Sequence, residues 1–158
     1  MRRIIRRREI VEDELRYAGE PAVDGSVGVV GAAEWLAASA AGAASAPEAV
    51  LLTATDEVEA LAGHLDGLRW IVIEFAKIGE GRGYSQARLL RQRYCYRHEL
   101  RARGALKRDQ MILLARCGFD AFELDPAEDL SAALAALGTF TVAYQDGNEA
   151  LVSLRRRA

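Results

Sequence analysis

The sequence predicts an α/β fold in which repeated strand-helix units form a mainly parallel sheet, and three observations lead to this prediction. Segments with strand patterns begin near residues 50, 70, 99, 119 and 140, and segments with helical spacing separate them. Strands joined by helical crossovers run parallel. The chain has 158 residues, fewer than the roughly 200 that a closed eight-stranded barrel needs. We therefore expect an open sheet, with a half-barrel as the alternative.

The first third of the chain carries weaker patterns. Apolar pairs mix with charges over residues 4–17, and the alternation within this stretch suits short edge strands. Residues 32–37 have the composition of a helix, and the Ala-, Gly- and Ser-rich residues 40–47 are typical of a loose connection. We expect one domain over residues 1–158, with the strand-helix repeats in residues 48–146.

The repeats themselves have clearer boundaries. A strand at 50–53 is followed by a helix that Asp56 would cap, with apolar residues at 58, 61, 62 and 65. A buried strand at 70–75 leads into a glycine-rich turn and a helix over 85–96 that begins at Ser85. The remaining expected elements are an extended segment at 99–103, a helix at 107–117 ending at Gly118, a strand at 119–124, a helix at 130–137 and a strand at 140–144.

Composition places the chain among soluble globular domains. Hydrophobic residues make up 51% and charged residues 28%, and the net charge is −2. No apolar stretch is long enough to span a membrane, and the Arg-rich start lacks the apolar run of a signal peptide. Two cysteines, Cys95 and Cys117, are too few for a disulfide framework or a zinc site. We expect a cytoplasmic protein without membrane attachment, and a homo-oligomer stays an open alternative.

The near-neutral net charge hides a basic middle. Eleven basic and three acidic residues lie between Lys77 and Arg116, a local charge of +8. A concentration of one sign of charge attracts and holds a partner of the opposite sign, so this segment indicates an anionic partner. Solvated helix faces paired with the acidic flanks of the chain are the alternative.

The glycine-rich turn after residue 75 is the candidate binding site. Its alternating glycines allow close backbone approach, and Ser85 would cap the next helix so that free N–H groups point at one spot. Arg88, near the third helical position, would place a cation at the positive end of the helix dipole, an arrangement that a bound anion would offset. The alternative is a tight turn whose arginines point to water. The candidate anion- or partner-binding residues are Gly81, Arg82, Gly83, Tyr84, Ser85, Arg88, Arg91 and Arg101.

Four residues are candidates for acid-base or nucleophilic chemistry: Glu74, Glu99, Asp109 and Cys117. Each has a structural alternative. The side chains of Glu99, Arg101 and Arg103 share one side of their strand, where they form either ion pairs or a polar wall facing the glycine-rich turn. Glu74 has the alternative of pairing with Arg82 or Arg101. Cys117, beside an apolar run, has the alternative of packing as a small hydrophobic residue.

The sequence carries no motif for a cofactor. The third glycine of the turn, Gly83, comes one residue too early for a nicotinamide fingerprint, and no phosphate-binding loop occurs. Neither a metal-ligand cluster nor a haem, flavin or iron–sulfur motif is evident. Nucleic-acid binding is disfavoured because the isoelectric point is about 5.8 and few aromatics interleave with the basic residues.

Linked motifs between residues 50 and 124 resemble a known family. They are Gly-Arg-Gly-Tyr-Ser-Gln-Ala-Arg-Leu-Leu-Arg at 81–91, Glu-Leu-Arg-Ala at 99–102, Arg-Asp-Gln at 108–110 and Arg-Cys-Gly-Phe-Asp-Ala-Phe at 116–122. The chain is thereby similar to a bacterial domain family of unknown function whose genes commonly lie beside the assimilatory sulfite reductase haemoprotein. Members are often labelled as oxidoreductases of sulfite reduction. Glu80, Cys95 and His98 depart from the pattern, with Asp expected at the first and Gly at the other two.

The resemblance implies a role in sulfur assimilation without fixing a reaction. Our main expectation is an accessory protein of sulfite reduction whose arginines bind an anionic partner, such as the sulfite reductase haemoprotein, or a small oxyanion. The alternative is a small enzyme, labelled as an oxidoreductase by family association, in which carboxylates act as acid-base groups and arginines clamp an anionic substrate.

Overall fold

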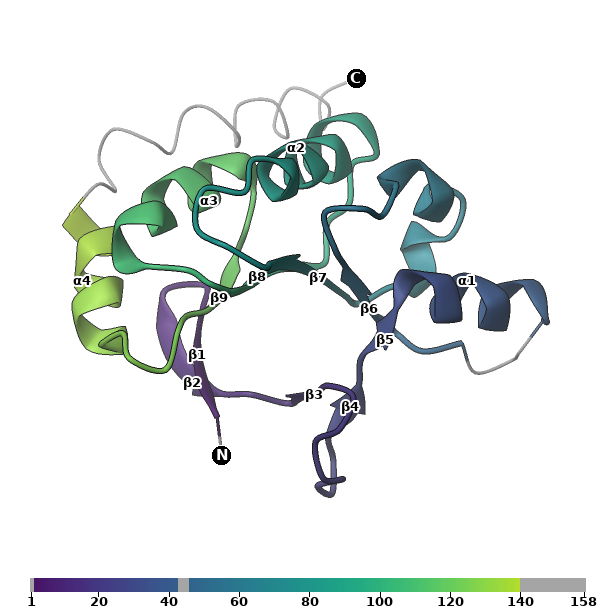
Figure 1. Cartoon of the computed structure of the whole chain (residues 1–158), viewed down its shortest axis with the longest axis horizontal. Coiled ribbons are helices and arrows are strands. Elements are labelled where there is room, and N and C mark those ends of the chain that lie inside the picture. The colour runs from purple at the N-terminus through teal and green to yellow at the C-terminus, as the bar shows by residue number, and fades with distance from the viewer. Residues whose placement is uncertain (1, 43–45, 140–158) are drawn as a thin grey trace, which may run out of the picture.

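A computed structural model describes residues 2–42 and 46–139, and it has the α/β architecture that the sequence predicts (Figure 1). Within these residues a seven-stranded sheet has the order β2-β1-β9-β8-β7-β6-β5, and it does not close into a barrel. A separate pair of strands, β3 and β4, forms a two-stranded sheet. The strands are β1 (Arg3–Arg6), β2 (Glu9–Glu12), β3 (Leu15–Arg16), β4 (Val27–Gly28), β5 (Val30–Gly31), β6 (Ala49–Leu52), β7 (Trp70–Phe75), β8 (Glu99–Gly104) and β9 (Ala121–Glu123).

The sheet is parallel from β5 to β9, as helical crossovers require, and its other end is antiparallel. There β1 pairs antiparallel with β9 and with β2. The N-terminal strands therefore extend the sheet beyond its last described parallel strand, and β2 forms its edge. In Figure 1 the sheet curves into an arc, with β3 and β4 across the open side.

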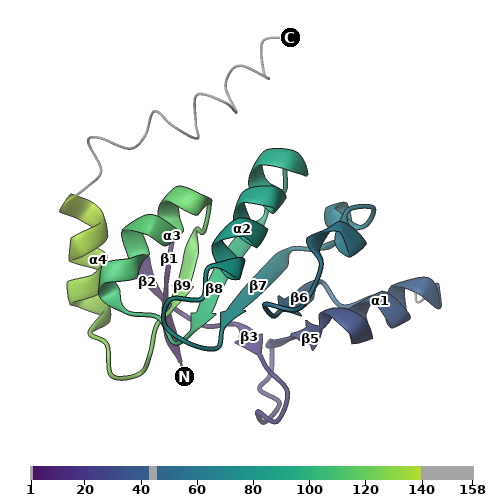
Figure 2. The same cartoon turned by 45° about the horizontal axis from the view of Figure 1, so that its top comes forward.

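Helices cover the convex face of the arc. They are α1 (Ala32–Ala40), α2 (Arg82–Arg88), which continues as a π-helical turn (Leu89–Arg93), α3 (Met111–Cys117) and α4 (Leu130–Thr139) (Figures 1 and 2). Alternate strand residues such as Ile71, Ile73 and Leu100 point toward them and are fully buried. The predicted stop of α3 is confirmed, since Gly118 ends it at φ +108°.

Two local predictions were wrong. The segment from Val58 forms two 3-10 turns, Val58–Leu61 and Leu65–Gly67, in place of a helix capped by Asp56. The carboxylate of Asp56 points backward and accepts hydrogen bonds from the Thr53 N–H at 2.7 Å and hydroxyl at 2.8 Å. The glycines at 63 and 67 disfavour a longer helix. Helix α2 begins at Arg82, so Ser85 lies inside it and caps nothing.

The last expected strand, at 140–144, lies outside the described residues, and so does part of the connection at 40–47. None of the helices formed by the described residues is long and apolar enough to cross a membrane.

The concave face of the sheet has an apolar half and a charged half. Ala49, Trp70 and Val72 pack against Leu15 and Tyr17 at the β3 strand. Strand β8, next in the sheet, turns charged side chains toward the same side. The chain between β2 and β4 therefore covers a surface on which apolar packing gives way to ion pairs.

Candidate functional site

The charged half of the concave face is built on the alternation of β8. Leu100 and Ala102 pack under the helices, which turns Glu99, Arg101 and Arg103 to the opposite face. Arg101 is fully buried and Glu99 is 8% exposed. Ion pairing, one of the two readings of this segment, is what the structure shows, because carboxylates surround both arginines.

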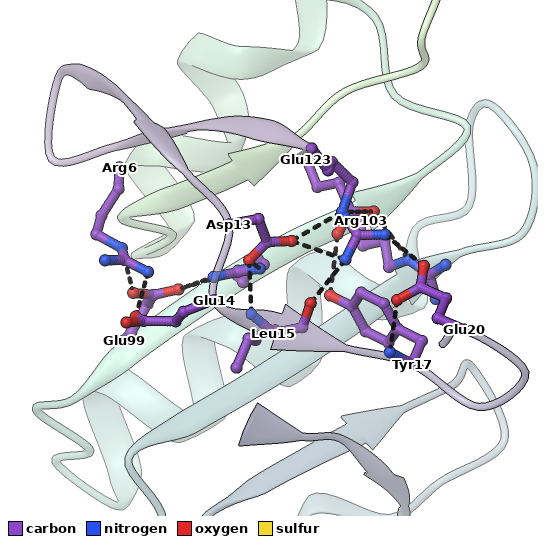
Figure 3. Close-up of polar contacts among 11 residues, drawn as sticks. Arg6, Asp13, Glu14, Leu15, Tyr17, Glu20, Glu99, Arg103 and Glu123 are labelled. Carbon is purple, nitrogen blue, oxygen red and sulfur yellow. Dashed lines mark hydrogen bonds and ion pairs between the residues drawn. The ribbon is translucent and has the colours of Figure 1, made fainter. Parts of the chain in front are cut away.

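Arg101 lies at the centre of this network, between Asp13 and Glu99, both of which are labelled in Figure 3. Its Nη1 donates to Asp13 Oδ1 at 2.6 Å, and its Nη2 and Nε donate to Glu99 Oε1 at 2.8 and 3.0 Å. Burial opposes the ionisation of Asp13, but Arg101, the Leu15 amide and Arg2 together outweigh it and lower the pKa of Asp13 below its ordinary value. Burial likewise opposes the charge on Arg101, and Glu99 and Asp13 outweigh it, so the pKa of Arg101 is raised.

The N-terminal segment is fastened to the sheet by a second arginine. Arg2 donates from Nε to Asp13 Oδ2 at 2.8 Å, from Nη1 to Glu20 Oε1 at 2.6 Å and from Nη2 to the Leu15 carbonyl at 2.9 Å. Arg6 pairs with Glu99 at 2.8 Å and with Glu14 at 2.5 Å. These contacts join β1 and β8 to the chain around β3.

A third arginine links the network to the carboxyl edge of the sheet. Arg103 donates from Nε to Glu123 Oε1 at 3.2 Å and from Nη1 to Glu74 Oε1 at 3.3 Å. Its guanidinium carbon lies 3.6 Å from the centre of the Tyr17 ring, a cation–π contact. The Tyr17 hydroxyl donates to Glu123 Oε2 at 2.9 Å. Burial, followed by the charge of Glu123, raises the pKa of Tyr17.

Beside Arg103 the surface opens into a pocket of about 660 Å³. It lies at the carboxyl ends of β8 and β9, the edge at which parallel α/β sheets bind ligands. The β9–α4 loop and the start of α4 form one wall, and β1 and β2 contribute to the other. The lining residues are Arg2, Arg3, Ile10, Glu74, Arg103, Gly104, Glu123, Leu124, Asp125, Pro126, Glu128, Asp129, Leu130 and Ser131.

The structure does not bring the predicted anion-binding residues into one site. Arg101 is buried on the concave face, whereas Arg82, Arg88 and Arg91 belong to the helix on the convex face and its continuation. Arg91 is held by backbone carbonyls: its Nε donates to Gly118 at 2.8 Å, and its Nη1 donates to Tyr96 at 2.7 Å and to His98 at 2.9 Å. Burial lowers the pKa of Arg91.

The start of α2 also differs from the sequence-based expectation. Because α2 begins three residues earlier than expected, Arg88 lies beyond its first turn, where a cation no longer opposes the positive end of the helix dipole. Arg82 pairs with Glu57 at 2.9 Å. Gly83 faces inward, where an added Cβ would lie 2.6 Å from the Phe75 ring, and Tyr84 stacks edge-on against that ring at 5.3 Å. Gly81 and Ser85 are exposed.

The four candidates for catalysis lie apart as well. Glu99 is engaged by Arg101 and Arg6, Asp109 is exposed in the turn before α3, and Cys117 is 1% exposed within the core that α3 completes. Glu74 lines the pocket and pairs with Arg103, and not with Arg82 or Arg101, the pairing expected as the alternative to an acid-base role. Asp13, Tyr17 and Glu123 were missed. The one sequence signal for this network was in β8, where charged residues occupy every second position, at Glu99, Arg101 and Arg103.

Across residues 2–42 and 46–139, no group of three or more His, Cys, Asp or Glu side chains is arranged to hold a metal ion. No curated protein and no solved structure matches the chain. A family model described as a bacterial protein of unknown function, DUF934, matches residues 49–154. This match covers more than half of the chain, which therefore belongs to the DUF934 family.

Proposed function

We propose that this protein is an accessory component of assimilatory sulfite reduction that binds an acidic surface of a partner protein, the sulfite reductase haemoprotein being our candidate. The pathway comes from the resemblance described above. The observation that carries the binding mode is a set of three exposed arginines along α2 and the π-helical turn, Arg82, Arg88 and Arg93. We call these three residues the arginine ridge.

Charge supports this proposal. Of the eleven basic residues between Lys77 and Arg116, all of them described, only Arg91, Arg101 and Arg103 are not exposed. The others face solvent on a segment with three acidic residues, one of which, Glu99, is buried. A surface of this kind steers an acidic partner and raises its association rate.

The side chains of the arginine ridge have few partners within the described residues, which also favours a binding role. The side chain of Arg88 makes no hydrogen bond or ion pair with any described residue, and the side chain of Arg93 has only a cation–π contact with Tyr94 at 5.6 Å among them. The pair between Arg82 and Glu57 is exposed on both sides, so exchanging it for a partner carboxylate costs little. Arginine suits such a surface because its guanidinium binds carboxylates with two parallel hydrogen bonds.

Calorimetric titration against the sulfite reductase haemoprotein at low and moderate salt tests the proposal. We expect binding that weakens as salt rises. The triple variant Arg82→Glu, Arg88→Glu and Arg93→Glu should lose it. The matched control changes Arg7, Arg8 and Arg69 to Glu, which alters the net charge equally on other elements, and it should retain binding.

Two outcomes would overturn this assignment. No heat at either salt would exclude the haemoprotein as partner, and equal losses in the two triple variants would reduce the effect to net charge. A parallel titration with sodium sulfite covers the small oxyanion: if sulfite binds and the haemoprotein does not, the accessory role falls and the oxyanion takes its place.

The second candidate, a small enzyme of sulfur metabolism, is favoured by one observation. Glu74, one of its proposed acid-base residues, lines a pocket at the carboxyl edge of the sheet. None of the arginines proposed as its anion clamp lines this pocket, although Arg103 does. Turnover of sulfite in the absence of the haemoprotein, abolished by Glu74→Gln in a variant that circular dichroism shows to be folded, would favour this candidate over the accessory role.

A further inference from the structure

We propose that the pocket at the carboxyl ends of β8 and β9 binds a small organic molecule that has a cationic amine and an apolar body. This inference goes beyond the partner-binding role, because the pocket shares no residue with the arginine ridge. Its volume of about 660 Å³ lies within the range of roughly 300–1,000 Å³ that is common for small-molecule sites.

The charge of the lining selects for a cation. Among the described residues that line the pocket, five are acidic and three are basic. Two of the basic residues, Arg2 and Arg103, already lie within 3.4 Å of Glu123. The remaining carboxylates leave an excess of negative charge, which would repel sulfite, sulfate or a second carboxylate.

Glu74 is the residue that we assign to the amine. Its Oε1 has one long contact, 3.3 Å to Arg103 Nη1, and its Oε2 accepts no hydrogen bond from any described residue. Both oxygens of Glu123, by contrast, have partners. The Glu74 side chain is 35% exposed, so an ammonium group can reach it from solvent and form charge-assisted hydrogen bonds.

The pocket also offers a contact surface for the apolar body of the ligand. Its apolar lining residues are Ile10, Leu124, Pro126 and Leu130. An inorganic cation would gain nothing from these side chains, whereas an alkyl or aromatic body would remove apolar area from water. Leu124 and Pro126 lie in the β9–α4 loop, and two aspartates of this loop stabilise it by accepting backbone hydrogen bonds. Asp125 accepts the Ala127 N–H at 2.9 Å, and Asp129 accepts the Ser131 N–H at 2.8 Å.

Nuclear magnetic resonance titration of the full chain with a matched pair of probes tests the inference. Pentylamine and pentanoate have the same alkyl body and opposite head charges, and sodium sulfate serves as the oxyanion probe at equal ionic strength. We expect pentylamine, in the millimolar range typical of weak fragments, to shift the backbone amides of Gly104, Leu124 and Asp125 in a saturable way. Pentanoate and sulfate should leave them in place.

Glu74→Gln should weaken the binding of pentylamine roughly tenfold, since it removes the charge and keeps the shape. Glu57→Gln, an exposed carboxylate outside the pocket, should leave it unchanged, and retained amide dispersion shows that each variant is folded. Larger shifts with pentanoate or sulfate would overturn the inference in favour of an anion site. Absence of any saturable shift, or equal losses in both variants, would overturn it outright.

Discussion

At the scale of single residues, Arg101 shows how a charge is accommodated in the interior of this sheet. Removing a guanidinium from water is costly unless its donors are satisfied by acidic partners. The side chain of Arg101 is fully buried, and its planar fork reaches Asp13 on one side and Glu99 on the other. A lysine has one compact ammonium and would not bridge the two carboxylates in this geometry.

Arg101→Met therefore leaves Asp13 and Glu99 buried without their main cation. We expect it to lower the free energy of unfolding by about 3–5 kcal/mol, as breaking a buried pair does. Arg82→Met, which breaks a pair exposed on both sides, should cost less than about 1 kcal/mol. Urea denaturation followed by circular dichroism measures both. Similar values for the two variants would contradict the structural role given to Arg101.

At the scale of elements, the join between β7 and β8 depends on close backbone contact. Phe75 pairs with Gly104 in the register of the two strands, and the Phe75 carbonyl accepts the Ala105 N–H at 2.8 Å. Gly104 adopts φ +111°, and a Cβ there would collide with the carbonyl oxygen of Phe75. The edge that carries the pocket is thus fixed by a residue without a side chain.

Gly104→Ala combines a left-handed backbone with a steric collision, so it should destabilise the protein by about 3 kcal/mol or more. Gly79→Ala is its control, because Gly79 has a similar φ of +85° and open space around it. That change should cost only about 1–2 kcal/mol. Thermal unfolding of the two variants separates backbone strain from collision. Equal losses would mean that the contact with Phe75 relaxes.

The sequence predicted those features that depend on residues close together in the chain, and it did not predict those that depend on distant residues. The apolar run of β7, the helix-ending Gly118 and the alternation of β8 were readable because each rests on neighbours in the chain. The helix expected after Asp56 failed because glycines and a backward turn outweigh apolar spacing. The pairing of Arg101 with Glu99 was one interpretation of the sequence, but the distant partners could not be predicted. Asp13 and Tyr17 are more than 80 residues away from Arg101 and Arg103 in sequence, and only the fold brings them close.

At the scale of the whole molecule, the two faces of the curved sheet are stabilised in different ways. The convex face is packed with apolar side chains under the helices, and this contribution changes little with pH. The concave face is covered by the segment around β3, which ion pairs from Asp13, Glu14 and Glu20 fasten to the rest. The fold therefore has one face whose stability depends on ionised carboxylates.

This dependence predicts a loss of stability in acid, and Asp13 is the residue that isolates it. The folded pKa of Asp13 lies below its ordinary value of 3.8, so the folded state binds this proton less readily than the unfolded state. Its stabilising contribution is then fully present above that ordinary value and is lost as pH falls through the lower folded pKa. Asp120 contributes with the opposite sign because burial raises its pKa, which is why a difference between two variants is needed.

We expect Asp13→Asn to be about 3 kcal/mol less stable than the unmodified chain near pH 7, because Arg101 and Arg2 lose a charged partner. The difference between the two proteins should shrink as pH falls below about 4, where the carboxylate that distinguishes them becomes protonated. Urea unfolding at a series of pH values measures this difference, and the contributions of Asp120 and of other carboxylates outside this ion-pair network cancel in it. A gap that stays constant down to the acid limit would mean that Asp13 acts through shape and hydrogen bonding alone, and that the charged face owes little to its ionisation.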